Sequence, residues 1–364
     1  MGSLFSCSLS PLAAVTLEYV AHACFVVESS SGERIVIDPF NSNRWLGYSF
    51  PNGLKADAVA VTHAHYDHNA AYYIPRAPVF RKPGEYAVGG LRLTGVPGKH
   101  AEPYGKEFGQ ANTLWVIEAD GVRIAHLGDT GPLDAEMIRG LGRVDVLLLP
   151  VDGDEHILKF PEVAAIIESL RPKITIPMHY RLTGLTELPA SLGPIDPWLK
   201  SRPEALRLSS HRVALTPEKL AKDGQIWVLP PSPDVKPWGP RMREADRLRL
   251  AARKAPEKEA IKQLRQAAAL APGAMRPSLE LARKLDGARQ SEEAATVLRE
   301  ALSRSAQMDY EFRVLARDLL AQIYERRGDT ALAAIQYRII LAESDWLDPL
   351  RRAREFLAAH PANR

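Results

Sequence analysis

Three histidines and one aspartate stand within six residues of the segment VTHAHYDH, residues 61–68. The chain has ten histidines among 364 residues, so this concentration calls for a chemical role. Imidazole and carboxylate groups are common ligands of divalent metal ions. If the segment is extended, His63 and His65 point to the same side and can bind one ion together. Asp67 and His68 follow where the chain turns, and they can serve a neighbouring ion.

Further ligands must complete each site, because Zn²⁺ usually takes four ligands. Three candidates follow other apolar stretches: His100 in GVPGKHAE, Asp129 in AHLGDTG and His179 in TIPMHY. Each lies where an apolar run ends at a loop, and loops positioned by a rigid scaffold often carry functional groups. We therefore expect strand ends to bring these side chains to residues 63–68.

The elements that must position these residues divide the chain into two parts. Before residue 230, short β-branched runs such as RIVID and KITIPMHY alternate with turns, and residues 160–170 show helical spacing, which predicts a mixed α/β domain over residues 1–229. The stretch PPSPDVKPWGP, residues 230–240, has five prolines and predicts an extended linker. From residue 241 to residue 364, apolar residues spaced by three and four predict an all-helical domain.

The helical part also repeats, with a step of 34 residues from Ala260 to Ala294 and of 39 residues from Ala294 to Ala333. Its small and aromatic positions resemble the tetratricopeptide repeat, whose period is 34 residues. An ordinary helical bundle is the alternative. The aligned positions are Ala260, Leu264 and Ala267; then Ala282, Leu285, Ala294, Leu298 and Ala301; then Ala321, Tyr324, Ala333, Tyr337 and Ile340.

Residues 63–68 spell H-x-H-x-D-H, and together with the three later candidates they resemble the metallo-β-lactamase fold superfamily over residues 15–229. The resemblance implies an αββα sandwich with a dinuclear metal site at one edge, followed here by the all-helical repeat domain. It also implies the ligand sets: His63, His65 and His100 for the first ion, Asp67, His68 and His179 for the second, and Asp129 as the bridge between them.

Finer features narrow the branch of that superfamily. The stretch EYVAHACFVVESSSGERIVIDPF is similar to the opening hairpin of the subgroup that contains L-ascorbate-6-phosphate lactonase and N-acyl-phosphatidylethanolamine phospholipase D. Ala21 replaces the glycine that usually precedes His22 in that subgroup. True β-lactamases carry cysteine or histidine where Asp129 stands, so antibiotic hydrolysis is not expected. Flavodiiron proteins carry glutamate at the second histidine, so His65 favours hydrolysis over redox chemistry.

The chemistry implied by this resemblance is hydrolysis of an ester-type bond, in a phosphodiester, lactone or thioester. Two divalent ions would lower the pKa of a shared water and supply hydroxide at neutral pH. Asp129 would hold both ions, and Asp67 would accept a hydrogen bond from the nucleophile, so both are expected to be catalytic. Zn²⁺ is the expected metal, with manganese and iron as alternatives.

Four other residues have a functional and a plain interpretation. Asp38 either orients a ligand histidine through its free N–H or is a turn residue before a proline. His22 either lines the pocket or caps a hairpin. Tyr180 either reaches the substrate or only packs against its neighbours. His156 lies in an expected active-site loop, where it either binds an anionic group or has no role in binding. His126 is expected to be a hydrogen-bonded core histidine.

The composition limits location and partners. Two cysteines provide no disulfide framework, which fits a reducing cytoplasm. No apolar stretch approaches the roughly 20 residues that span a bilayer, although MGSLFS matches the N-myristoylation pattern. A net charge of +3 without a concentrated basic run excludes nucleic acid as a partner. The substrate is expected to be a small or lipid-like molecule.

The role of the helical repeats leaves an alternative open. The chain could be an interaction protein, whose repeats bind a partner or a second copy of the chain and whose front domain is only a scaffold.

Overall fold

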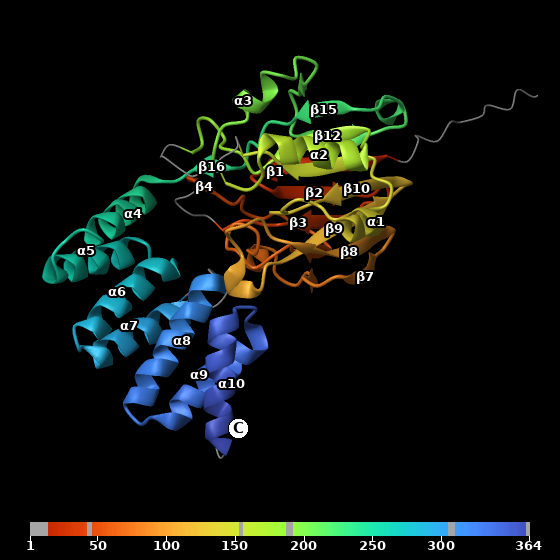
Figure 1. Ribbon diagram of the computed structural model, residues 1–364. Coiled ribbons are helices and arrows are strands. Elements are labelled where there is room, and N and C mark those ends of the chain that lie inside the picture. The colour runs from red at the N-terminus through yellow and green to blue at the C-terminus, as the bar shows by residue number, and fades with distance from the viewer. Residues whose placement is uncertain (1–13, 42–45, 153–155, 187–191, 305–309, 362–364) are drawn as a thin grey trace, which may run out of the picture.

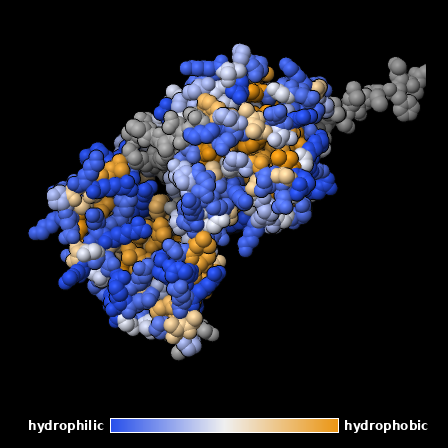
Figure 2. Space-filling view, viewed as in Figure 1, coloured by the Kyte–Doolittle hydropathy of each residue, from blue (hydrophilic) through white to orange (hydrophobic). Residues whose placement is uncertain are grey.

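The computed structural model describes residues 14–41, 46–152, 156–186, 192–304 and 310–361. Within these ranges two facing sheets occupy the chain up to residue 228, and helices follow from residue 240 to residue 359 (Figure 1). The expected order, a mixed α/β sandwich followed by an all-helical region, is confirmed. Figure 2 shows hydrophilic residues over most of the visible face, with hydrophobic residues in smaller patches.

The first sheet has six strands in the order β14-β1-β2-β3-β5-β6. Its first strands form antiparallel hairpins, whereas β3, β5 and β6 run parallel. The strands are β1 (Val15–Ala21), β2 (Cys24–Glu28), β3 (Arg34–Ile37), β5 (Ala58–Ala60), β6 (Val79–Phe80) and β14 (Arg212–Leu215).

The second sheet has eight strands in the order β13-β15-β12-β11-β10-β9-β8-β7. Every residue of β11 and β12 is buried, as expected for central parallel strands covered on both faces. The strands are β7 (Gly84–Val88), β8 (Leu91–Lys99), β9 (Ala111–Ala119), β10 (Val122–His126), β11 (Val146–Pro150), β12 (Ile174–Met178), β13 (Leu206–Arg207) and β15 (Gln225–Val228).

Short helices connect and cover these strands. The amphipathic α2 (Phe160–Leu170) lies between β11 and β12 in sequence and buries Val163, Ile166 and Leu170 in the same core as the sheets. The others are α1 (Ala135–Leu141), α3 (Asp196–Leu199) and the 3₁₀ turns η1 (Ala71–Tyr73), η2 (Lys106–Phe108) and η3 (Lys219–Ala221).

The predicted site residues follow the ends of four strands. β5 ends at Ala60, just before the histidine-rich segment, and β8 ends at Lys99, just before His100. β10 ends three residues before Asp129, and β12 ends directly before His179. The prediction that strand ends carry these side chains is therefore confirmed.

The histidine-rich segment itself is not extended, so that part of the expectation is wrong. β5 ends at Ala60, and the chain then turns, with the amides of His68 and Asn69 donating to the carbonyl of His65 at 3.0 and 2.9 Å. The rings of His63 and His65 still meet, with centroids 5.0 Å apart. They therefore meet outside a regular strand.

The connector after β15 stays attached to the sandwich. Lys236–Pro237 forms strand β16, which pairs with β4 (Tyr48–Ser49). The helices that follow are α4 (Pro240–Ala252), α5 (Glu257–Leu270), α6 (Met275–Gly287), α7 (Ser291–Arg304), α8 (Tyr310–Arg326), α9 (Thr330–Glu343) and α10 (Leu347–Ala359). The domain limits read from the sequence, 1–229, 230–240 and 241–364, stay a prediction.

The helical region has its own hydrophobic core. Consecutive helices contact each other, α4 with α5, α6 with α7 and α8 with α9. All positions aligned in the sequence repeat are buried, from Ala260 to Ile340. Small residues at these places let paired helices approach closely, but assignment to the tetratricopeptide family stays a prediction.

Among the described residues, no helix combines the length and the apolar composition that a membrane crossing requires. The N-terminal MGSLFS pattern and Cys7 lie outside the described residues, whereas Cys24 is a buried free thiol. The cytoplasmic location stays a prediction.

Substitution of Leu298 by alanine tests the separate helical core. Leu298 of α7 is fully buried in the helical core, so its truncation is expected to lower the free energy of unfolding by about 2 to 5 kcal/mol. Urea denaturation followed by circular dichroism measures this loss. The exposed Leu332 of α9 is the control, and its replacement by alanine should cost less than about 0.5 kcal/mol. Equal losses in both variants would contradict the assignment of Leu298 to a core.

Candidate metal centre

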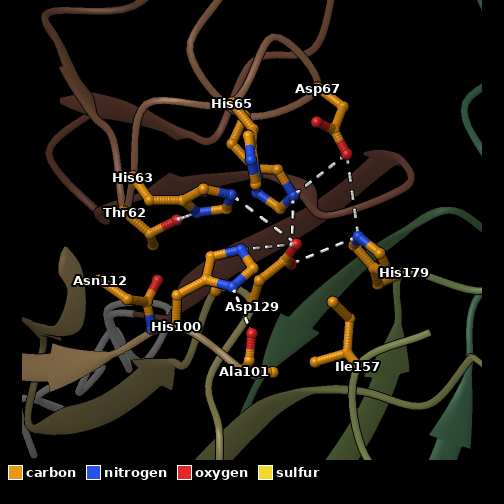
Figure 3. A network of polar contacts seen from close by, with 12 residues as sticks. Thr62, His63, His65, Asp67, His100, Ala101, Asn112, Asp129, Ile157 and His179 are labelled. Carbon is orange, nitrogen blue, oxygen red and sulfur yellow. Dashed lines mark hydrogen bonds and ion pairs between the residues drawn. The ribbon is translucent and has the colours of Figure 1, made fainter. Parts of the chain in front are cut away.

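The predicted ligand side chains meet at the edge where β5, β8, β10 and β12 end (Figure 3). They form three overlapping groups in which one ligand atom from each member lies within 4.8 Å of the others. All seven predicted ligands belong to these groups, and His22 and Asp38 join them. The groups are His63, His65, His100 and Asp129; His22, Asp67, His68 and His179; and Asp38, His63 and His68.

The first group surrounds one oxygen of Asp129. Atom Oδ2 of Asp129 lies 3.7 Å from Nε2 of His63 and 3.6 Å from Nε2 of His100. The rings of His63, His65 and His100 have centroids 4.7 to 5.0 Å apart and meet at steep angles of 77 to 87°. Nearly perpendicular rings around one point leave room for an ion between them.

The second group surrounds the other oxygen of the same carboxylate. Atom Oδ1 of Asp129 lies 3.2 Å from Nε2 of His68 and 3.3 Å from Nε2 of His179. Atom Oδ2 of Asp67 lies 3.5 and 3.8 Å from the same two nitrogens. One carboxylate therefore faces two sets of imidazoles, one with each oxygen.

Several of these atoms have no hydrogen bond within the part of the chain that the structure describes. These buried atoms are Nε2 of His63, of His68 and of His100, and Oδ1 of Asp129. Buried polar atoms are nearly always satisfied, so a convergent set of unsatisfied ones needs an explanation. Imidazole nitrogens and carboxylate oxygens are a donor set for Zn²⁺ and related ions. The residues present therefore fit a divalent cation.

The carboxylates of the centre are charged at neutral pH. Burial raises the pKa of Asp129, but the neighbouring His179 and His68 outweigh it and hold that pKa well below its usual value. Asp67 behaves in the same way, with His68 as the main opposing charge. Without an ion, the charged imidazoles of His179 and His68 balance these two carboxylates.

Without an ion, the histidines of the centre differ in the direction in which their pKa is shifted. Burial lowers the pKa of His179, but Asp129 and Asp67 raise it to about 9. The pKa of His68 is also raised well above its usual value by carboxylates, against the effect of burial. His63 has its pKa lowered, because burial and the nearby His68 both disfavour its charged form.

Asp38 orients histidines from both groups. Its carboxylate accepts hydrogen bonds from the backbone N–H of Thr62 at 2.7 Å, the hydroxyl of Thr62 at 2.6 Å and Nδ1 of His68 at 2.7 Å. Since the Thr62 hydroxyl spends its one hydrogen on Asp38, it must accept from Nδ1–H of His63, 2.9 Å away. Both histidines therefore keep a proton on Nδ1 and turn Nε2 toward Asp129, so Nε2 is the nitrogen that each can offer to an ion.

Two other ring orientations are fixed in the same way. The carbonyl of Ala101 can only accept, so Nδ1 of His100 donates to it at 2.9 Å, and Nε2 faces the centre. His65 uses its other nitrogen: Nε2 bonds Glu107 of η2 at 2.9 Å. Its Nδ1 is therefore the nitrogen left for an ion. Thr62 and Glu107 were missed from the sequence. A hydroxyl residue directly before H-x-H could have signalled Thr62, but Glu107 has no local signal.

His22 stands in the turn between β1 and β2, and its ring lies in the centre. It is fully buried, and its Nε2 donates to Oδ2 of Asp67 at 3.0 Å. Its backbone has φ of 57°, and its carbonyl accepts from the amide of His179 at 3.0 Å. A left-handed backbone at a non-glycine residue costs free energy and is concentrated at functional sites. Burial and His179 lower its pKa to about 3, so the ring is neutral.

His156 and Tyr180 differ in their surroundings. His156 lines a cavity of about 470 Å³ together with His100, Tyr104 and Ile157. Its ring stacks on Tyr104 at 4.3 Å and runs parallel to that of His179 at 5.9 Å. Burial and His179 lower its pKa to about 4, which favours a neutral hydrogen-bonding role over the anion-binding alternative. Tyr180 is buried in the front core, and its contact with substrate stays a prediction.

His126 is a core histidine, as expected. Its Nε2 donates to the carbonyl of Ala23 at 2.7 Å, and its Nδ1 accepts from the amide of Gly128 at 3.2 Å.

Replacement of Asp38 by asparagine is expected to weaken divalent metal binding by about 10- to 100-fold, because the uncharged amide has one acceptor oxygen and cannot hold Thr62 and His68 together as the two carboxylate oxygens do. Isothermal titration with Zn²⁺ measures the change. Asp57→Asn is a matched control, since Asp57 also accepts from a backbone N–H, that of Arg34 at 2.8 Å, but on the exposed surface. Equal affinity in the two variants would show that Asp38 does not orient the ligands.

Comparison with known proteins identifies the family of this chain. A family model described as the Beta-lactamase superfamily domain matches residues 16–179. The chain is 34% identical to a UPF0173 metal-dependent hydrolase of Thermococcus onnurineus, over 46% of this chain and 84% of that relative. It is 30% identical to another of that name from Archaeoglobus fulgidus, over 47% of this chain and 85% of the relative.

Among solved structures, the chain is similar to one named as a Zn-dependent hydrolase of the metallo-beta-lactamase superfamily, from Thermotoga maritima. That match has a TM-score of 0.47 and 28% identity, and it covers 59% of this chain and 98% of the other. The region that the family model matches, residues 16–179, lies within the sandwich that carries the candidate metal centre. The chain belongs to the UPF0173 metal-dependent hydrolases of the metallo-β-lactamase superfamily.

Proposed function

We propose that this hydrolase uses two divalent metal ions, with Zn²⁺ the first choice, to cleave an ester-type bond in a phosphodiester, a lactone or a thioester. The observation that carries the proposal is the position of Asp129. Its two oxygens face two different sets of imidazoles at 3.2 to 3.7 Å. A carboxylate so placed can bridge two ions.

The two sets of side chains divide the ligand roles. In this proposal His63, His65 and His100 hold one ion, Asp67, His68 and His179 hold the other, and Asp129 contacts both. Two divalent ions bound there would lower the pKa of a water molecule toward neutrality and polarise a substrate oxygen. Asp67, whose lowered pKa keeps it charged, can accept a hydrogen bond from the nucleophile.

Other side chains prepare the centre for this chemistry. Asp38 and Thr62 fix the proton on Nδ1 of His68 and His63, so that Nε2 is the nitrogen that each ring presents to an ion. His22 holds the carboxylate of Asp67 through a hydrogen bond of 3.0 Å. Mutations of such outer partners typically cost much of a site's metal affinity.

The cavity beside His100 is the proposed place for substrate. It has a volume of about 470 Å³, within the range of small-molecule pockets, and its walls combine apolar Ile157 and Leu158 with the imidazole of His156. A neutral His156 can donate a hydrogen bond to a substrate oxygen. This mixture of surfaces suits a small or lipid-like substrate with a polar reacting end.

The alternative of a pure scaffold has less support, since all seven predicted ligand positions carry metal-binding side chains that converge. Binding of a partner by the helical region is compatible with hydrolysis and stays a prediction.

Metal content and turnover test the proposal together. We expect about two equivalents of metal in the purified protein, and hydrolysis of at least one member of a panel of phosphodiesters, lactones and acyl thioesters. Asp129→Asn is expected to lower turnover by at least 100-fold, since it weakens the bridge. Asp134→Asn is the control: Asp134 caps α1, and asparagine caps a helix equally well. One equivalent of metal with full activity would refute the dinuclear form.

Removal of metal is expected to lower thermal stability. Ions that bind only the folded chain stabilise it by about 2.7 kcal/mol at a concentration 100 times the dissociation constant. Dialysis against a chelator should therefore lower the Tm in differential scanning calorimetry, and added Zn²⁺ should restore it. The change in Tm on metal removal should be smaller in Asp129→Asn, because that variant binds metal more weakly. An unchanged Tm would indicate that the buried cluster holds no ion.

A further inference from the structure

The helical region contacts the two loops that carry the first group of ligands. Tyr66, inside the H-x-H-x-D-H segment, stacks on Phe312 of α8 with centroids 5.9 Å apart and planes at 29°. Phe108 of η2 meets Trp346, directly before α10, edge to face at 6.3 Å and 72°. Figure 1 shows α10 lying beside the loop that follows β8, and α10 and η2 are in contact.

Phe108 is itself packed on the metal centre. Its ring centroid lies 4.8 Å from that of His65, and 5.9 Å from each of those of His63 and His100. The preceding residue, Glu107, holds Nε2 of His65. The turn η2 therefore forms the layer directly behind the first group.

The loop that carries η2 is tightly closed, so a movement at one end is passed to the other. His100 donates its amide to Gln110 at 2.8 Å, and Gln110 donates to Gly105 at 2.8 Å. Gly105 has φ of 79°, and a Cβ there would lie 2.7 Å from Cγ of His100, so the backbone packs directly on the ligand ring. On the other side, a Cβ at Gly109 would lie 3.9 Å from Leu347.

A cavity at the same junction shows how near the helical region comes to the ligands. It has a volume of about 340 Å³, and Asp345 lines it together with Thr62, His63 and Phe108. Asp345 and Trp346, the two residues directly before α10, therefore lie next to the first group on the side of Phe108.

We propose that Trp346 and Phe312 are positioning residues of the metal centre, through which the helical region holds the two metal-binding loops and raises the affinity of the His63–His65–His100 group for its ion. The proposal rests on the proposed metal-binding function. Neither residue touches the reacting atoms. Trp346 acts through Phe108, and Phe312 acts through Tyr66.

The test is the affinity for Co²⁺, measured in the full-length protein by visible absorption against a competing chelator. The step that belongs to the first group is the one that His65→Ala abolishes. Trp346→Ala is expected to weaken that step about tenfold, the lower end for partners outside the ligand set. Trp346→Phe should restore most of the affinity, because it keeps an aromatic ring at the contact.

Leu332→Ala is the matched control, because Leu332 is an exposed apolar residue of α9 in the same region. It should bind Co²⁺ like the wild type. Phe312→Ala provides a second, independent perturbation through Tyr66 and should also weaken the step. Apo Trp346→Ala should keep the wild-type Tm within about 2 °C, which separates positioning from a general loss of folding. Apo Phe312→Ala should have a lower Tm, because Phe312 also packs against the helical core, so circular dichroism must show that it is folded at the temperature of the titration.

The outcomes separate this inference from the proposed function. Wild-type affinity in both Trp346→Ala and Phe312→Ala would overturn the inference and leave the metal centre intact. Equal weakening in Leu332→Ala would also overturn it, since the effect would then be unspecific. A wild-type protein that binds no Co²⁺ would overturn the proposed function, and this inference with it.

Discussion

The buried carboxylate of Asp129, shared by two sets of imidazoles, is the interaction on which the rest of the structure depends. Asp129 is 2% exposed, and a buried charge is tolerated only when opposite charges or ligands compensate it. Compensation requires side chains from the ends of four strands to reach one point. The sandwich provides this, because both sheets bring strand ends to the same edge. Three residues of the centre, His22, Asp38 and His179, accept a left-handed backbone to do so.

Proton positions in the centre follow from hydrogen bonds outside it. A neutral imidazole has one donor nitrogen and one acceptor nitrogen, so a partner that can only accept decides which nitrogen is which. Asp38 and the carbonyl of Ala101 act in this way for His68 and His100, and Thr62 passes the effect of Asp38 to His63. The nitrogen that each of these rings presents to an ion is thus set before any ion arrives. A binding site prepared in this way loses little free energy to reorganisation.

The helical region adds a layer behind the ligands. Its hydrophobic core is separate from that of the sandwich, yet aromatic residues at its rim face the two metal-binding loops. Through these contacts the helical region, which contributes none of the predicted ligands, packs against the loops that hold them. A partner bound to the helices could use the same route, because η2 joins Trp346 on one side to His65 and His100 on the other.

Residue types and spacing were sufficient to predict the metal-binding character and the fold class. The dense H-x-H-x-D-H segment and three more ligands after apolar runs reveal the chemistry, since few other side chains bind divalent ions. The alternation of short strands and the later helical spacing reveal the order of the two parts. These signals are local, so each can be read from a few neighbouring residues.

The outer partners were decided only by the tertiary structure. Glu107 lies 42 positions from His65, and no pattern links them, because a folded loop makes the contact. The extended conformation expected at His63 and His65 was wrong, because the strand ends at Ala60 and hydrogen bonds from His68 and Asn69 to His65 fold the segment that follows. The approach of Trp346 to Phe108 likewise depends on how two separate cores dock. Local sequence encodes which groups can bind a metal, whereas long-range packing decides how those groups are held.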